Sequence, residues 1–172
     1  YAAIFENYKP ALTDMEARQS LIYDSLVIKK RVIEIDEYDR DYRNIMNYGH
    51  TFGHALESVA NYSIPHGVAV VVGIGLANHV SAWLGLLPER VRVKMEALVL
   101  ENSGGVDLRI DDLGPFWDAL KRDKKNIDSN INFVLTEGFG KMFKKRLQLD
   151  GKLKGEIARY LRERGIYAGG EN

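Results

Sequence analysis

The chain has 172 residues, 45% of them hydrophobic and 28% charged, which is enough apolar material for a soluble domain with a substantial core. Basic and acidic residues number 24 each, and a net charge of zero argues against nucleic-acid binding and against a membrane-surface role. The absence of cysteine excludes disulfides, thiolate metal sites and a cysteine nucleophile, and it fits a cytoplasmic location.

Apolar residues three and four positions apart dominate the chain and predict a mainly α protein with a small β-hairpin. The first helix is expected from about Asp14 to Ile35, and an acidic turn over 36–41 follows it. Its core candidates are Met15, Leu21, Ile22, Leu26, Ile28 and Val32. Further helices are predicted over about 43–61, 66–86, 88–103, 114–122 and 150–163, with a hairpin that pairs 131–136 with a segment near 141–145.

The run from Gly67 to Leu87 is the most apolar part of the chain, but Asn78, His79 and Ser81 interrupt it. It therefore predicts a buried helix and no transmembrane span. His79 has no carboxylate at helical spacing within this run, and we interpret it as structural. Strands and helices do not alternate along the chain, which argues against a dinucleotide-binding fold.

The predicted helix 43–61 carries a polar stripe. At about 100° per residue, one side of that helix presents Arg43, Asn47, His50 and His54. A buried polar group without a partner costs about 1–3 kcal/mol, and a charged, oxygen-rich ligand would supply the partners. An exposed polar face with two incidental histidines is the alternative.

A third histidine supports a metal site. His66 follows Pro65 at the start of the next predicted helix, and a short turn between antiparallel helices would return it to His50 and His54. Imidazoles from adjacent helices, together with a carboxylate, form a usual catalytic zinc set. Thr51 stands where a His-Glu-x-x-His protease has its glutamate, so a zinc protease is not expected.

Basic residues gather at two predicted helix ends, over 29–31 and 121–125. Cations favour helix C-termini, so a solvated terminus is one interpretation. A clamp for phosphate or carboxylate is the other, since Lys and Arg give charge-assisted hydrogen bonds.

Several separate blocks of the sequence resemble the 3-dehydroquinate synthases, which are sugar-phosphate cyclases. The blocks are Arg43-x3-Asn47-x-Gly49-His50-Thr51-x-Gly53-His54-Ala55-x-Glu57, His66-Gly67-x-Ala69-Val70-x-x-Gly73, Lys29, Asp36-Glu37, Leu84-Gly85-Leu86 and Asp123-Lys124-Lys125. The resemblance covers the chain from about residue 20 onward. It implies that residues 1–172 are the helical C-terminal metal- and substrate-binding domain, and that the N-terminal NAD-binding domain is absent from this chain.

The resemblance also implies an activity. The expected enzyme is a phosphate-eliminating carbon–oxygen lyase of the shikimate pathway, in aromatic amino acid biosynthesis. It would cyclise 3-deoxy-arabino-heptulosonate 7-phosphate to 3-dehydroquinate with zinc, or another divalent metal, and NAD. Its implied partners are the phosphorylated sugar acid, the N-terminal NAD domain and a second copy in a homodimer, with no nucleic acid and no membrane.

Carried over to this sequence, the resemblance implies a set of site residues. His50 and His66 would be metal ligands, and His54 and Lys29 would be catalytic. The substrate would be held by Arg43, Asn47, Lys124 and Lys125. The family's third ligand, a Glu three residues before a Lys, is expected before Tyr1, because the surroundings of Glu6 and Lys9 differ from the family helix. This chain alone is expected to be inactive and to bind zinc weakly.

One position departs from the family pattern. The family usually reads His-Gly-Glu, whereas this chain has His66-Gly67-Val68. The departure leaves open another cyclase, such as a 2-deoxy-scyllo-inosose or 2-epi-5-epi-valiolone synthase or one that serves a surface polysaccharide. A glycerol dehydrogenase-like, metal-dependent alcohol dehydrogenase is a further alternative, although a neutral alcohol would give Arg43, Asn47 and Lys29 no anion to hold. A metal-free helical interaction module is the last.

Overall fold

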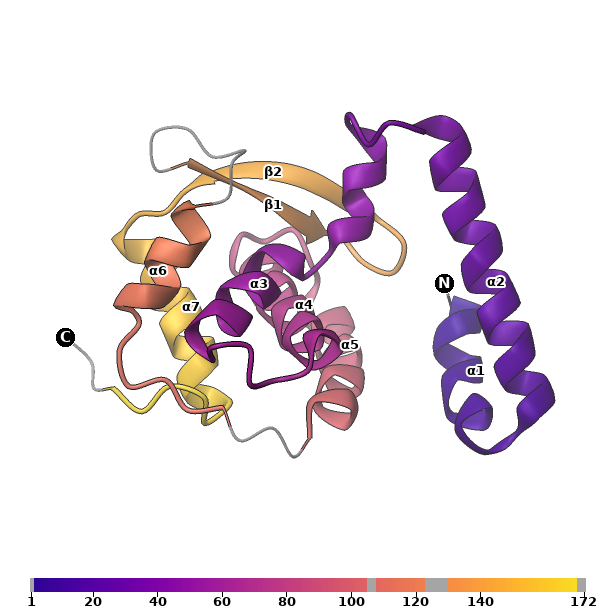
Figure 1. Ribbon diagram of the computed structural model, residues 1–172, viewed down its shortest axis with the longest axis horizontal. Coiled ribbons are helices and arrows are strands. Elements are labelled where there is room, and N and C mark those ends of the chain that lie inside the picture. The colour runs from indigo at the N-terminus through magenta and orange to yellow at the C-terminus, as the bar shows by residue number, and fades with distance from the viewer. Residues whose placement is uncertain (1, 105–107, 123–129, 170–172) are drawn as a thin grey trace. The chain divides into compact units, whose positions relative to one another are not determined.

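The computed structural model describes residues 2–104, 108–122 and 130–169. It divides into two compact units, Tyr1–Met46 and Asn47–Asn172, and each is described by itself. The described residues form seven α-helices, one short 3-10 helix and a two-stranded antiparallel sheet (Figure 1). The prediction of a mainly α fold with a small hairpin is confirmed.

The first unit is a helical hairpin of α1 (Ala2–Thr13) and α2 (Met15–Ile35). Asp14, where the helix was expected to begin, caps α2, because its carboxylate accepts the Ala17 N–H at 3.0 Å. Helix α1 was not predicted; it contains Pro10, which is unfavourable inside a helix. The expected core of α2 is wrong in part. Val32 is buried, but three apolar positions are more than half exposed: Met15, Ile22 and Leu26.

The acidic turn after α2 is confirmed and is organised by one carboxylate. Asp36 accepts backbone N–H groups of Arg40, Asp41 and Arg43 at 2.8–3.0 Å. These hydrogen bonds, the one from Arg43 first, lower the pKa of Asp36 from 3.8 to about 2. The Arg43 guanidinium donates to the Glu37 carbonyl oxygen at 3.0 Å, so this side chain also braces the turn.

The prediction of one continuous helix over 43–61 is wrong. Residues Tyr42–Asn47 form the 3-10 helix η1, and the α-helix α3 spans only His50–Val59. The chain breaks at Gly49, whose φ of +80° is left-handed. Arg43 and Asn47 therefore do not share a helix with the histidines, and only His50 and His54 keep the predicted spacing of one turn.

The second unit is built around α4 (His66–Trp83), which packs against α3, α5 (Glu89–Ser103), α7 (Gly151–Glu163) and the sheet. Helix α6 (Gly114–Lys121) packs on α3. Among the described helices, α4 alone is long and apolar enough to cross a membrane, but 56% of it is buried inside the protein. It is the buried helix that the apolar run predicted.

The hairpin pairs β1 (Asn130–Thr136) with β2 (Met142–Gln148), with Asn130 opposite Gln148 at one end of the ladder. Strand β1 lies against α4, where the Ser81 hydroxyl accepts the Thr136 N–H at 3.1 Å. The ring of Phe133 stacks on Phe52 of α3 with centroids 4.9 Å apart. The hairpin thus closes one side of the core that holds α3 and α4.

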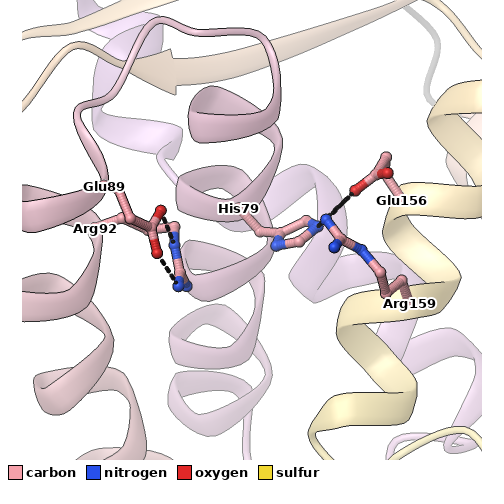
Figure 2. A network of polar contacts seen from close by, with 5 residues as sticks. All are labelled: His79, Glu89, Arg92, Glu156 and Arg159. Atoms are coloured by element: carbon pink, nitrogen blue, oxygen red, sulfur yellow. Dashed lines mark hydrogen bonds and ion pairs between the residues drawn. The ribbon is translucent and has the colours of Figure 1, made fainter.

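A polar network surrounds His79 on α4 (Figure 2). Its Nε2 lies 3.1 Å from Glu156 of α7, and Glu156 also accepts a hydrogen bond from Arg159 at 2.5 Å. On α5, Arg92 donates two hydrogen bonds to Glu89. This pair and His79 line the same cavity of about 300 Å³. Burial lowers the pKa of His79. A buried, bonded ring fits the predicted structural role, although its carboxylate comes from another helix.

Candidate metal centre

Glycines let α3 and α4 approach each other closely. A Cβ atom on Gly73 of α4 would overlap the carbonyl oxygen of Gly49 and lie 2.8 Å from the nitrogen of Gly53. Gly49 itself has no room for a side chain, because Ile74 and the carbonyl oxygen of Val70 would lie only 2.6–2.7 Å from its Cβ. Residues without side chains at this crossing therefore set the distance between the two helices.

Two further features fix the start of α3 and the return to α4. The hydroxyl of Tyr48 donates to the buried side-chain oxygen of Asn78, which ties the segment before Gly49 to α4. After α3 the chain reverses through Asn61 and Tyr62, both in left-handed conformation, and Pro65 precedes α4. This reversal brings the first residue of α4, His66, back beside α3.

Three imidazole rings converge at this place. The ring centroids of His50 and His54 lie 5.5 Å apart, those of His50 and His66 lie 5.4 Å apart, and those of His54 and His66 lie 5.8 Å apart. Two imidazoles bound to one tetrahedral zinc at 2.0–2.1 Å would have centroids roughly 5 Å apart. The three rings thus stand near the spacing of metal ligands, and the predicted convergence of His66 on the α3 histidines is found.

The hydrogen bonds of the rings distinguish the three histidines. The Nδ1 atom of His66 lies 3.1 Å from both carboxylate oxygens of Glu57. The Nδ1 atom of His50 lies 3.4 Å from the carbonyl oxygen of Tyr48. For His54, the described residues provide no hydrogen-bond partner. Among the described residues, His50 and His66 thus each use Nδ1 in a hydrogen bond and leave Nε2 available, whereas neither nitrogen of His54 has a partner.

Burial also differs among these side chains. Glu57 is buried on α3, while His54 and His66 are exposed. Burial lowers the pKa of the half-buried His50, although the Tyr48 carbonyl acts in the opposite direction. A lowered pKa keeps the His50 imidazole neutral near pH 7, and the neutral ring is the form that binds a metal.

A second grouping of possible ligands overlaps the predicted one. His54, Glu57 and His66 each offer a ligand atom, and these atoms lie within 4.8 Å of one another. Sequence reasoning missed Glu57 as a member of the site. Its signal was the position three residues after His54, on the same side of a helix.

The other predicted site residues lie elsewhere in the chain. Asn47 is exposed at the end of η1, and Lys29 and Arg43 belong to the first unit. Lys124 and Lys125 fall outside the described residues. The substrate-binding and catalytic roles expected of these five residues therefore stay predictions.

Comparison with known proteins gives a consistent picture. The family model described as 3-dehydroquinate synthase C-terminal matches residues 2–126. The chain is 34% identical to a 3-dehydroquinate synthase of Campylobacter jejuni subsp. jejuni serotype O:23/36 (strain 81-176), over 90% of this chain and 42% of the relative. It is 38% identical to that of Dehalococcoides mccartyi (strain ATCC BAA-2266 / KCTC 15142 / 195), over 76% of this chain and 37% of the relative. The chain thus spans about two fifths of the length of these relatives.

Solved structures show the same kind of similarity. A 2-deoxy-scyllo-inosose synthase complexed with carbaglucose-6-phosphate, NAD+ and Co2+ matches with a TM-score of 0.71 at 25% identity. The match covers 84% of this chain and 41% of that one. The helical fold described above is therefore shared with a sugar-phosphate cyclase that was solved with NAD and a divalent metal.

Proposed function

Since this chain belongs to the 3-dehydroquinate synthase family, whose C-terminal model matches residues 2–126, we propose that it is the metal- and substrate-binding half of a 3-dehydroquinate synthase. The whole enzyme would convert 3-deoxy-arabino-heptulosonate 7-phosphate to 3-dehydroquinate with loss of phosphate, as a carbon–oxygen lyase of the shikimate pathway. The observation that carries the proposal is the convergence of three imidazoles from α3 and α4 at 5.4–5.8 Å.

The hydrogen bonds of the rings support His50 and His66 as the metal ligands. An imidazole that binds metal through one nitrogen usually donates the other N–H to a carboxylate or a backbone carbonyl. His66 meets this condition through Glu57, and His50 meets it, at a longer distance, through the Tyr48 carbonyl. His54 lacks such a partner among the described residues, which suits a ring that contacts the substrate.

Each group has a distinct part in the proposed reaction. Bound zinc would act as a Lewis acid on a substrate oxygen, and NAD on an N-terminal domain would accept and return the hydride. His54, one turn along α3 from His50, would hold or move a proton at the substrate. The carboxylate and phosphate of the substrate would be held by Lys29, Arg43, Asn47, Lys124 and Lys125. In this proposal the enzyme is a cytoplasmic homodimer.

A second candidate is another sugar-phosphate cyclase, of the 2-deoxy-scyllo-inosose synthase type. The structural match to such an enzyme favours it, as does Val68, where the family usually has glutamate beside the second metal ligand. Dehydroquinate synthase is preferred because the curated relatives at 32–38% identity carry that name.

The substrate is tested by phosphate release from the full-length protein with zinc and NAD. Release from 3-deoxy-arabino-heptulosonate 7-phosphate is expected. Release from glucose 6-phosphate alone would replace the proposal with the second candidate.

The ligand assignment is tested by zinc titration of three variants. His50→Ala and His66→Ala should each weaken zinc binding strongly, because each removes a ligand. His54→Ala should keep the zinc affinity and lose turnover. An equal loss of affinity in all three variants would reject the substrate-facing role of His54.

A further inference from the structure

We propose that Glu57 is a positioning residue, which accepts the Nδ1–H of His66 and so presents its Nε2 atom to the metal. The inference rests on the proposed function and deepens it, because it assigns a role to a residue outside the expected ligand set. Both carboxylate oxygens of Glu57 lie 3.1 Å from Nδ1 of His66, so the ring nitrogen faces the middle of the carboxylate.

The contrast in burial indicates which partner holds the other. The Glu57 side chain is 10% exposed and is fixed on α3, whereas the His66 side chain is 56% exposed at the first residue of α4. An exposed imidazole at a helix start would otherwise sample several rotamers. A buried carboxylate in turn needs a donor, and in the described part of the chain Nδ1 of His66 is the donor that it has.

This pairing selects one tautomer of the His66 ring. A proton held on Nδ1 leaves a lone pair on Nε2. The hydrogen bond made by one ring nitrogen thus decides which nitrogen can bind the metal. Glu57 supplies a carboxylate to the same ring from the preceding helix.

The competing assignment makes Glu57 a metal ligand, together with His54 and His66. That assignment would leave His50 out, although the rings of His50 and His66 are the closest pair of the three at 5.4 Å. The positioning role gives both histidines the same arrangement, with Nδ1 on a protein oxygen and Nε2 available. It therefore accounts for more of the observed contacts.

The tautomer can be measured without metal, by ¹⁵N correlation NMR of the His66 ring in this chain at a pH where the ring is neutral. The wild type is expected to carry the proton on Nδ1. Glu57→Leu, which removes the acceptor at similar volume, should shift the ring toward the Nε2–H tautomer. An Nε2–H ring in the wild type would overturn the proposal.

Cobalt and zinc titrations separate positioning from ligation. Glu57→Gln keeps an acceptor oxygen, so it should weaken zinc binding less than Glu57→Leu, for which a loss of about 10–100-fold is expected. Glu57→Gln should also leave the visible spectrum of bound Co²⁺ unchanged. Equal losses in the two variants with an altered Co²⁺ spectrum would make Glu57 a ligand. If Glu57→Leu does not fold, Glu57→Gln and the wild-type tautomer still decide the question.

Glu156→Gln is the matched control, because Glu156 contacts His79 at the same 3.1 Å in a pair remote from the metal centre. It should change neither the His66 tautomer nor zinc binding, and a change in either would contradict a local effect of Glu57. The outcome is separable from the proposed function. Zinc binding that needs His50 and His66 but not Glu57 would remove this inference and leave the metal centre in place.

Discussion

Replacing Gly73 with alanine is expected to force α3 and α4 apart. On helix propensity alone the change would stabilise α4 by up to about 1 kcal/mol. The new methyl group, however, would overlap the carbonyl oxygen of Gly49 and lie 2.8 Å from the nitrogen of Gly53. Both are backbone atoms, which cannot rotate away as a side chain would. Overpacking typically costs about 1–3 kcal/mol and occasionally more, so the steric term should win, with a net destabilisation of about 2 kcal/mol.

Urea unfolding followed by helical circular dichroism measures this difference, provided that the slope with denaturant is unchanged. Gly155→Ala is the control, because Gly155 is exposed within α7 and a Cβ there meets no atom within 4 Å. The control should be more stable than the wild type by about 0.5–1 kcal/mol. A Gly73→Ala variant as stable as the wild type would refute the close crossing that positions His50 and His66.

Three further perturbations address other parts of the structure. Because burial lowers the pKa of His79, the unfolded chain takes up a proton on this ring at a higher pH than the folded chain does. The free energy of unfolding should therefore be highest above about pH 6.5 and should fall as the pH drops below that value. His79→Gln should reduce this fall, as measured by urea unfolding at several pH values. The Asp36 carboxyl should titrate near pH 2 by NMR, so its contribution is present above 3.8 and is lost as pH falls toward 2; a midpoint near 3.8 would contradict the three hydrogen bonds. Leu56→Ala, at a fully buried position, should lower the free energy of unfolding by about 2–5 kcal/mol, and a loss below about 1 kcal/mol would contradict its place in the core.

Local signals were sufficient for most of the elements. Asp14, at the predicted start of the helix, caps α2, Pro65 and Pro88 directly precede helices, and Pro115 lies in the first turn of α6. Caps and prolines act on the nearest turn of the chain, so their effect is visible without the rest of the fold. The family signature likewise indicated that His50, His54 and His66 belong to one site, and their rings do converge.

Other features depended on the packing of distant residues. A glycine within a helical pattern does not by itself indicate a break, so the sequence did not reveal the left-handed turn at Gly49. The turn is seen in the structure, where Gly73 packs against the Gly49 backbone. The apolar positions Met15, Ile22 and Leu26 of α2 were expected in the core but are exposed. Within the first unit α2 packs against α1, which does not cover these three side chains.

The sequence by itself determined most of the helical segments, where several of them begin, and which histidines gather, but it indicated neither α1 nor the break at Gly49. Only the tertiary structure decided how each ring is held. Glu57 reaches His66 because the chain reverses between α3 and α4, and Glu156 reaches His79 across 77 residues of chain. Helical periodicity describes neighbours within a few turns, whereas the partner of a side chain at a helix crossing depends on how two helices pack.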